Sequence, residues 1–145
     1  MSRLSRRERG SASIEMAILT PALLALFVML MIAGRTTLAR QAVAAAAFDA
    51  ARTASLARDG SLAQAQAVTV ATETLQSQGL FCTNLDPVTV DTSEFATPVG
   101  QPAQVTATVT CAVTFADIAL PGMPSGATFT ATFVSPLDQF RSRSP

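Results

Sequence analysis

One long apolar run near the N-terminus limits what this chain can fold into. It covers residues 16–33 and is interrupted only by Thr20 and Pro21. Extended back to Ile14, it allows an α-helix to cross about 30 Å of hydrocarbon at about 1.5 Å per residue. The run therefore predicts a single transmembrane helix, which we assign to residues 11–34.

The residues at the start of this run form a second pattern. Glu15 lies at the edge of the apolar segment, where a carboxylate is costly and is therefore interpreted as functional. It follows Gly10 by five positions, and Ser11 and Glu15 share one face of a helix because they are four residues apart. A plain membrane anchor does not explain this spacing. The pattern therefore makes Gly10, Ser11 and Glu15 candidate site residues.

This stretch resembles the processing site of type IV prepilins, and more closely that of TadE-like pseudopilins of tight-adherence (Flp-type) pili. In that family a short basic leader ends in glycine, and a small residue, a glutamate, an apolar helix and a proline follow. Gly10, Ser11, Glu15 and Pro21 occupy these positions, whereas Met16 stands where the family often has an aromatic residue. The resemblance implies that a prepilin peptidase cleaves between Gly10 and Ser11. It also implies that Glu15 pairs with the new N-terminus of a neighbouring subunit.

The same interpretation divides the chain into a leader at 1–10, a transmembrane helix at 11–34 and an extracytoplasmic head at 35–145. An excess of basic residues on one side of a span marks its cytoplasmic end. Four arginines precede the span and two follow it: Arg3, Arg6, Arg7 and Arg9, against Arg35 and Arg40. We therefore expect a single-pass protein of the cytoplasmic membrane, with its N-terminus in the cytoplasm and its head outside. Incorporation of the head into a pilus is left open.

The N-terminus also allows two other interpretations. A secretory signal peptide would be cleaved after the apolar run, but residues 33–36 offer no clean small-x-small site, and the run is long for a signal. An uncleaved bitopic anchor explains the hydrophobicity and the arginines, but not the spacing of glycine, serine and glutamate. The prepilin-type interpretation explains all of these features.

The composition restricts the chemistry that this chain can perform. Histidine, lysine, tryptophan and tyrosine are absent. Without histidine or lysine, most arrangements that move protons or activate nucleophiles are unavailable, and metal sites lose their commonest ligand. We therefore expect no enzymatic activity, no catalytic or metal-binding residues and no cofactor. After cleavage the chain keeps six arginines and nine acidic residues, a net charge of −3, which provides no basic stripe for nucleic acid.

Cys82 and Cys111 both fall in the predicted extracytoplasmic head. Two cysteines in such a compartment most often form a disulfide. Closing a loop of about 30 residues would contribute about 3.5 kcal/mol in the chain-entropy model. The alternative is a pair of buried free thiols, which an oxidising compartment disfavours.

The head shows helical periodicity first. Residues 36–58 are rich in alanine and extend the first helix, which we expect to end with Gly60 in a left-handed conformation. A second helix is expected to start at Ser61, where Gln64 would complete a capping box, and to end at Gly79.

Alternating patterns then predict three strands: Val88–Val90, Gln104–Phe115 and Thr128–Val134. The side chains expected to face the core share one face of each long strand: Val105, Ala107, Val109, Cys111, Val113 and Phe115 on the second, and Phe129, Ala131 and Phe133 on the third. The tail, 141–145, is expected to be disordered. The predicted fold is α+β, with a long N-terminal transmembrane helix that continues into a small head of one further helix and a three-stranded antiparallel sheet.

The predicted function is that of a minor pilin-like component, or pseudopilin, of a tight-adherence type IV pilus assembly or secretion system. The resemblance implies as partners a prepilin peptidase, a partner pseudopilin, the major pilin, the inner-membrane assembly platform and membrane lipid. A head of over one hundred residues favours the minor role, since a major pilin of this system is little more than the helix. The alternative is a single-pass membrane-anchored extracytoplasmic binding module, which would need an apolar pocket with convergent polar groups.

Overall fold

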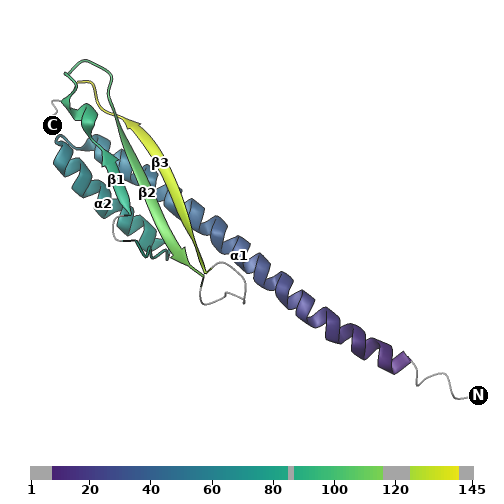
Figure 1. Cartoon of the computed structure of the whole chain (residues 1–145). Coiled ribbons are helices and arrows are strands. Elements are labelled where there is room, and N and C mark those ends of the chain that lie inside the picture. Colours follow the sequence, from purple (N-terminus) through teal and green to yellow (C-terminus); the bar gives the residue numbers. More distant parts are fainter. Residues whose placement is uncertain (1–7, 85–86, 116–124, 141–145) are drawn as a thin grey trace, which may run out of the picture. The chain divides into compact units, whose positions relative to one another are not determined.

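The computed structural model describes residues 8–84, 87–115 and 125–140 (Figure 1). Its elements in chain order are helix α1 (Glu8–Leu56), helix α2 (Gly60–Ser77), strand β1 (Val88–Asp91), a short 3-10 helix η1 (Ser93–Ala96), strand β2 (Gln104–Thr114) and strand β3 (Gly126–Pro136). The chain forms two compact units, Met1–Thr36 and Thr37–Pro145, and residues of α1 belong to both. The predicted α+β fold is confirmed. The tail at 141–145 lies outside the described residues.

The three strands form one antiparallel sheet in the order β1-β2-β3. The central strand β2 pairs with β3 over its whole length, from Gln104 opposite Pro136 to Thr114 opposite Gly126. Residues 106–109, in the first half of β2, also pair with β1. The alternation seen in the sequence is confirmed on β2, where the fully buried side chains are Val105, Ala107, Val109 and Cys111.

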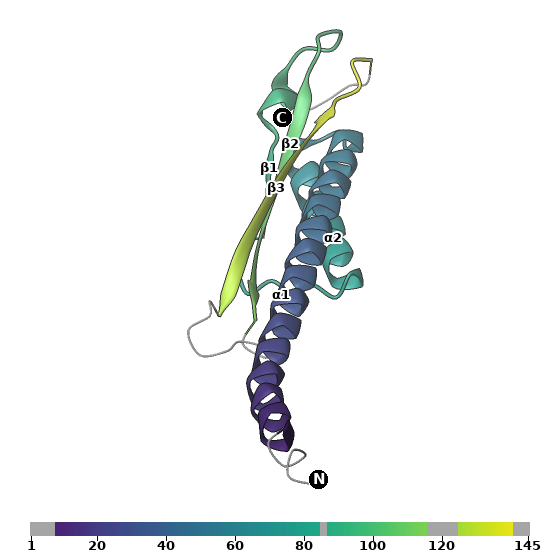
Figure 2. The same ribbon diagram turned by 90° about the vertical axis from the view of Figure 1, so that its right-hand side faces the viewer.

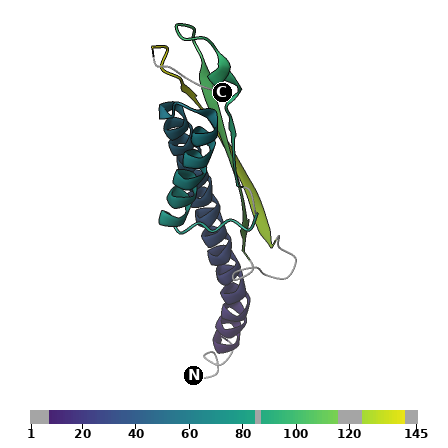
Figure 3. The same cartoon turned by 90° about the vertical axis from the view of Figure 1, so that its left-hand side faces the viewer.

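Alanine dominates the packing of the two helices of the head. The part of α1 from Thr37 onward and α2 lie side by side on one face of the sheet (Figures 2 and 3). Small side chains allow close approach between packed elements. The buried alanines of these helices are Ala39, Ala42, Ala46, Ala47, Ala50, Ala51, Ala54, Ala63, Ala67 and Ala71. The largest fully buried side chains of the core are Phe95, Val43, Val105, Val109 and Cys111.

Helix α2 begins one residue earlier than predicted and is capped by a different residue. The Asp59 carboxylate accepts hydrogen bonds from the N–H groups of Ser61 (2.7 Å) and Leu62 (3.3 Å). The predicted capping box of Ser61 and Gln64 is therefore wrong. Aspartate is as good an N-cap residue as serine, and Asp59 caps the helix two positions before Ser61. The Gln64 side chain instead accepts a hydrogen bond from the N–H of Val90 at 3.1 Å.

The prediction for Gly60 is also wrong, whereas the prediction for Gly79 is confirmed. Gly60 is the first residue of α2, is buried, and does not have a positive φ. The left-handed residue is Gly79, with φ of 71°. Its N–H bonds the carbonyl of Gln76, and the next N–H bonds the carbonyl of Leu75, both at 2.9 Å. These two bonds are the Schellman motif that ends a helix at a left-handed glycine.

One side chain predicted to face the core is only half covered. Phe129 of β3 is buried, but Phe133 on the same face is 42% exposed. The Phe133 ring packs edge-to-face on Phe48 of α1, with 4.8 Å between ring centroids and an interplanar angle of 84°. Among the described residues β3 pairs with β2 alone, so no further strand covers Phe133. Phe133 therefore contacts helix α1, but the prediction that it is buried in the core is wrong.

Candidate functional site

The predicted processing site lies in the first turns of α1. The helix begins at Glu8, so the backbones of Gly10 and Ser11 are both helical and the peptide bond between them lies inside the helix. The rest of the predicted leader, residues 1–7, is outside the described part, as are the side chains of 8–13. Glycine costs a helix about 1 kcal/mol relative to alanine. Gly10 therefore weakens the helix at the bond that is predicted to be cleaved.

Glu15 lies at the boundary of the apolar surface. It is exposed on α1 and is the second residue of a stretch, starting at Ile14, that is long and apolar enough to cross a membrane. None of the most apolar part of that stretch is buried within the protein. In the uncleaved chain the nitrogen of Ser11 is a peptide amide, and it becomes an amine only when the bond after Gly10 is cut. A Glu15–amine pair therefore requires processing.

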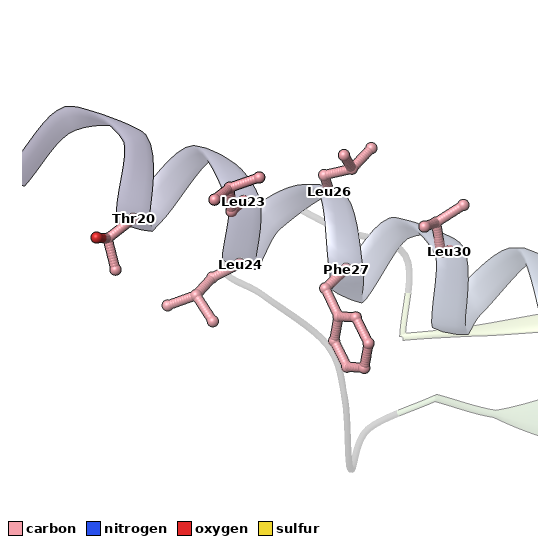
Figure 4. A pocket seen from close by; sticks show the side chains of 6 residues that line it. All are labelled: Thr20, Leu23, Leu24, Leu26, Phe27 and Leu30. Carbon is pink, nitrogen blue, oxygen red and sulfur yellow. The ribbon is translucent and has the colours of Figure 1, made fainter. Parts of the chain in front are cut away.

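The apolar stretch that follows is largely exposed within the described residues. Most of its large side chains between Ile14 and Met31 are 44% to 68% exposed, and Val28 is half-buried. In Figure 4, Leu23, Leu26 and Leu30 project to one side of the ribbon and Leu24 and Phe27 to the other. These five residues and Thr20 line a pocket on this stretch. A helix that is apolar on all sides is typical of a membrane span. The pocket is therefore part of the exposed apolar surface of α1.

Residues 10–52 match a protein-family model described as TadE-like protein. This segment is TadE-like. It begins at Gly10, the residue predicted to precede the cleaved bond, and it includes Ser11, Glu15 and the apolar run. No curated protein and no solved structure matches the chain. The family resemblance inferred from the sequence is thereby confirmed.

The TadE-like segment has two different surfaces, one in each compact unit. Its first part carries the exposed apolar side chains described above. Its second part, from Ala39 to Arg52, supplies the buried alanine face that packs in the head. Helix α2 and all three strands lie beyond the TadE-like segment.

The predicted pair of cysteines is joined. Cys82 and Cys111 form a disulfide, with 5.0 Å between their Cα atoms and a sequence separation of 29. Cys111 is buried in the central strand β2, whereas Cys82 belongs to the segment that follows α2. The prediction of a disulfide is confirmed, and the alternative of two free thiols is wrong.

Sequence reasoning missed Asn84, which, like the disulfide, joins the segment after α2 to strand β2. Its side-chain amide donates to the carbonyl of Thr110 at 2.7 Å, and its side-chain oxygen accepts from the N–H of Ala112 at 3.0 Å. The N–H of Thr83 also donates to the carbonyl of Ala112 at 2.9 Å. These bonds extend the pairing along β2 beyond β1. No local signal identifies Asn84, because its partners lie 26 and 28 residues further along the chain.

We predict that removing the disulfide destabilises the head strongly. In Cys82→Ala/Cys111→Ala the loss of the cross-link should lower the free energy of unfolding by about 3.5 kcal/mol in the chain-entropy model. The measurement is the urea midpoint of the detergent-solubilised protein, followed by circular dichroism. Wild-type protein treated with dithiothreitol is the matched control and should shift by a similar amount. Two freely alkylated thiols in native protein would contradict the prediction.

Side chains that could act as metal ligands do not cluster within the described residues. Within them, no three His, Cys, Asp or Glu side chains gather in a group that could hold a metal ion. The pKa of Asp91 is lowered because its carboxylate accepts hydrogen bonds from the backbone N–H and the hydroxyl of Ser93. This arrangement is a turn at the end of β1.

A groove of about 370 Å³ on the head is lined by α1 and β3 residues: Arg40, Val43, Ala127, Thr128, Phe129 and Thr130. The guanidinium carbon of Arg40 lies 5.9 Å from the centre of the Phe129 ring, in reach of a cation–π contact. None of the polar side chains in the described part of the chain is buried. The groove therefore lacks the convergent buried polar groups that a small-molecule site needs.

Proposed function

We propose that this protein is a pseudopilin, a minor structural component of a tight-adherence-type pilus assembly or secretion system. It would be made as a precursor and cut between Gly10 and Ser11 by a prepilin peptidase. The observation that carries the proposal is the TadE-like segment itself, which begins at Gly10 and holds Glu15 at the start of an exposed apolar helix. The role requires no catalysis by this chain.

In this role each part of the chain has a physical task. The exposed apolar side chains of α1 hold the subunit in lipid before assembly. Glu15 then favours the position at which its carboxylate meets the N-terminal amine of a neighbouring subunit. The neighbours would be a partner pseudopilin and the major pilin, brought together at the inner-membrane platform. The head, held by its disulfide, remains outside the membrane.

The orientation follows from the arginines that flank the span. A protease added to spheroplasts should digest the head after Arg35 and spare an N-terminal tag. The control is the same digestion after detergent lysis, which should remove both. An intact head together with a digested tag would reverse the orientation and contradict the proposed role.

The decisive test of the proposed function is the N-terminal residue of the protein extracted from its native membrane. Intact mass and N-terminal sequencing should show a chain that starts at Ser11. A chain that starts at Met1 would indicate an uncleaved anchor. A chain that starts after Ala33 would indicate a secretory signal peptide. Either of these results would contradict processing by a prepilin peptidase.

A further inference from the structure

Phe81 is an exposed aromatic side chain on a backbone that is held on both sides. The preceding residue, Leu80, donates its N–H to the carbonyl of Leu75 and packs against the core. The following residue, Cys82, is bonded to Cys111 of the central strand. Phe81 itself is nevertheless 73% exposed. The structure thus turns a large apolar ring outward at a fixed position.

Contacts within the head unit connect Phe81 to Arg40, which lies near the start of that unit. Cys82, the residue after Phe81, is bonded to Cys111. Cys111 lies opposite Phe129 in the register of β2 and β3. The Phe129 ring in turn lies beneath the guanidinium of Arg40. Arg40 belongs to the first turn of the head unit, which starts at Thr37.

This end of the head follows directly on the apolar run. Thr37 comes three residues after Gly34, so it lies about 4.5 Å along the helix from the end of the predicted span. The polar headgroup layer adds roughly 5 to 7 Å on each side of the hydrocarbon core. Leu38, which is 66% exposed, therefore falls within that layer. Membrane helices are on average tilted by about 20°, and such a tilt brings residues on one side of the helix end closer to the lipid.

We propose that the base of the head, formed by Leu38 and Phe81, is a lipid-contacting surface whose occupant is the boundary between headgroups and acyl chains. The Phe81 ring enters this boundary, as apolar residues of interfacial segments do. The contact would limit the directions in which the head can lean before the subunit enters an assembly. The inference rests on the membrane anchoring contained in the proposed function.

The absence of tryptophan and tyrosine from the chain provides a clean test. Phe81→Trp introduces a single tryptophan at the base of the head. Phe140→Trp is the matched control, because Phe140 is 88% exposed and follows the end of β3 that pairs with the start of β2, away from the base. Each full-length variant is reconstituted into phosphatidylcholine vesicles, with or without bromine on the upper acyl chain. Flotation of the vesicles in a density gradient measures anchoring separately.

The expected result is that both variants float but differ in fluorescence. The emission of Phe81→Trp should be shifted to shorter wavelength and largely quenched by brominated lipid. The emission of Phe140→Trp should be quenched by aqueous iodide instead. Flotation with iodide quenching of both tryptophans would overturn the lipid contact and leave the anchoring intact, and equal lipid quenching of both would overturn its assignment to the base. Failure of both variants to float would refute the anchoring, and the lipid contact with it.

Discussion

Replacing Gly10 with valine should leave the protein at full length in the membrane, with no detectable chain that starts at Ser11. A peptidase must bring its catalytic groups close to the backbone on both sides of the cleaved bond. Glycine permits this approach because it has no side chain, whereas the branched side chain of valine obstructs it. The measurement is the ratio of precursor to mature protein by intact mass in cells that contain the prepilin peptidase.

Gly34→Val provides the matched control for this variant. Gly34 is also helical, and a Cβ atom added there meets no atom within 4 Å. The same substitution at the other end of the apolar run should therefore leave processing unchanged. Equal yields of the Ser11 form from wild type and Gly10→Val would refute the proposed cleavage site. Loss of processing in both variants would show that the effect is not specific to Gly10.

Replacing Glu15 with alanine should abolish pilus formation while leaving insertion and cleavage intact. Cleavage gives Ser11 an α-amino group with a reference pKa near 8, which is largely protonated at neutral pH. An unpaired carboxylate at the edge of hydrocarbon costs on the order of 2 to 3 kcal/mol by insertion scales. Pairing with the amine of a neighbouring subunit removes much of this cost. The corresponding bias in the assembly equilibrium is roughly 30- to 150-fold.

Two further variants separate this role from the other effects of a carboxylate near a helix N-terminus. Glu15→Gln keeps the shape and removes the charge, so it should fail in assembly as Glu15→Ala does. Glu73→Ala removes an exposed carboxylate of α2 and should support normal piliation. The measurements are counts of pili and co-purification with the partner pseudopilin, after mass analysis has shown that each variant starts at Ser11. Normal piliation by processed Glu15→Ala would mean that Glu15 serves only the helix dipole or the lipid boundary.

Several features of the site were predictable because their signals are local. The spacing of Gly10 and Glu15 before an apolar run is visible in a window of about 25 residues, the usual scale of a membrane span and its flanks. The TadE-like match covers the same stretch and continues to Arg52. The cysteine pair was predictable for a different reason, since the chain has only two cysteines and both fall in the predicted head.

The amino-acid sequence by itself determined the apolar span, the two helices, the alternating strands and the end of α2 at Gly79. Each of these depends on periodicity or on a conformational preference within a few residues. The tertiary structure alone decided which polar groups meet across the chain. Gln64 bonds Val90 instead of capping its own helix, and Asn84 bonds Thr110, each over 26 residues. It also decided that Phe133 stays half exposed, because the burial of a strand residue depends on the neighbours of its strand and not on its own alternation.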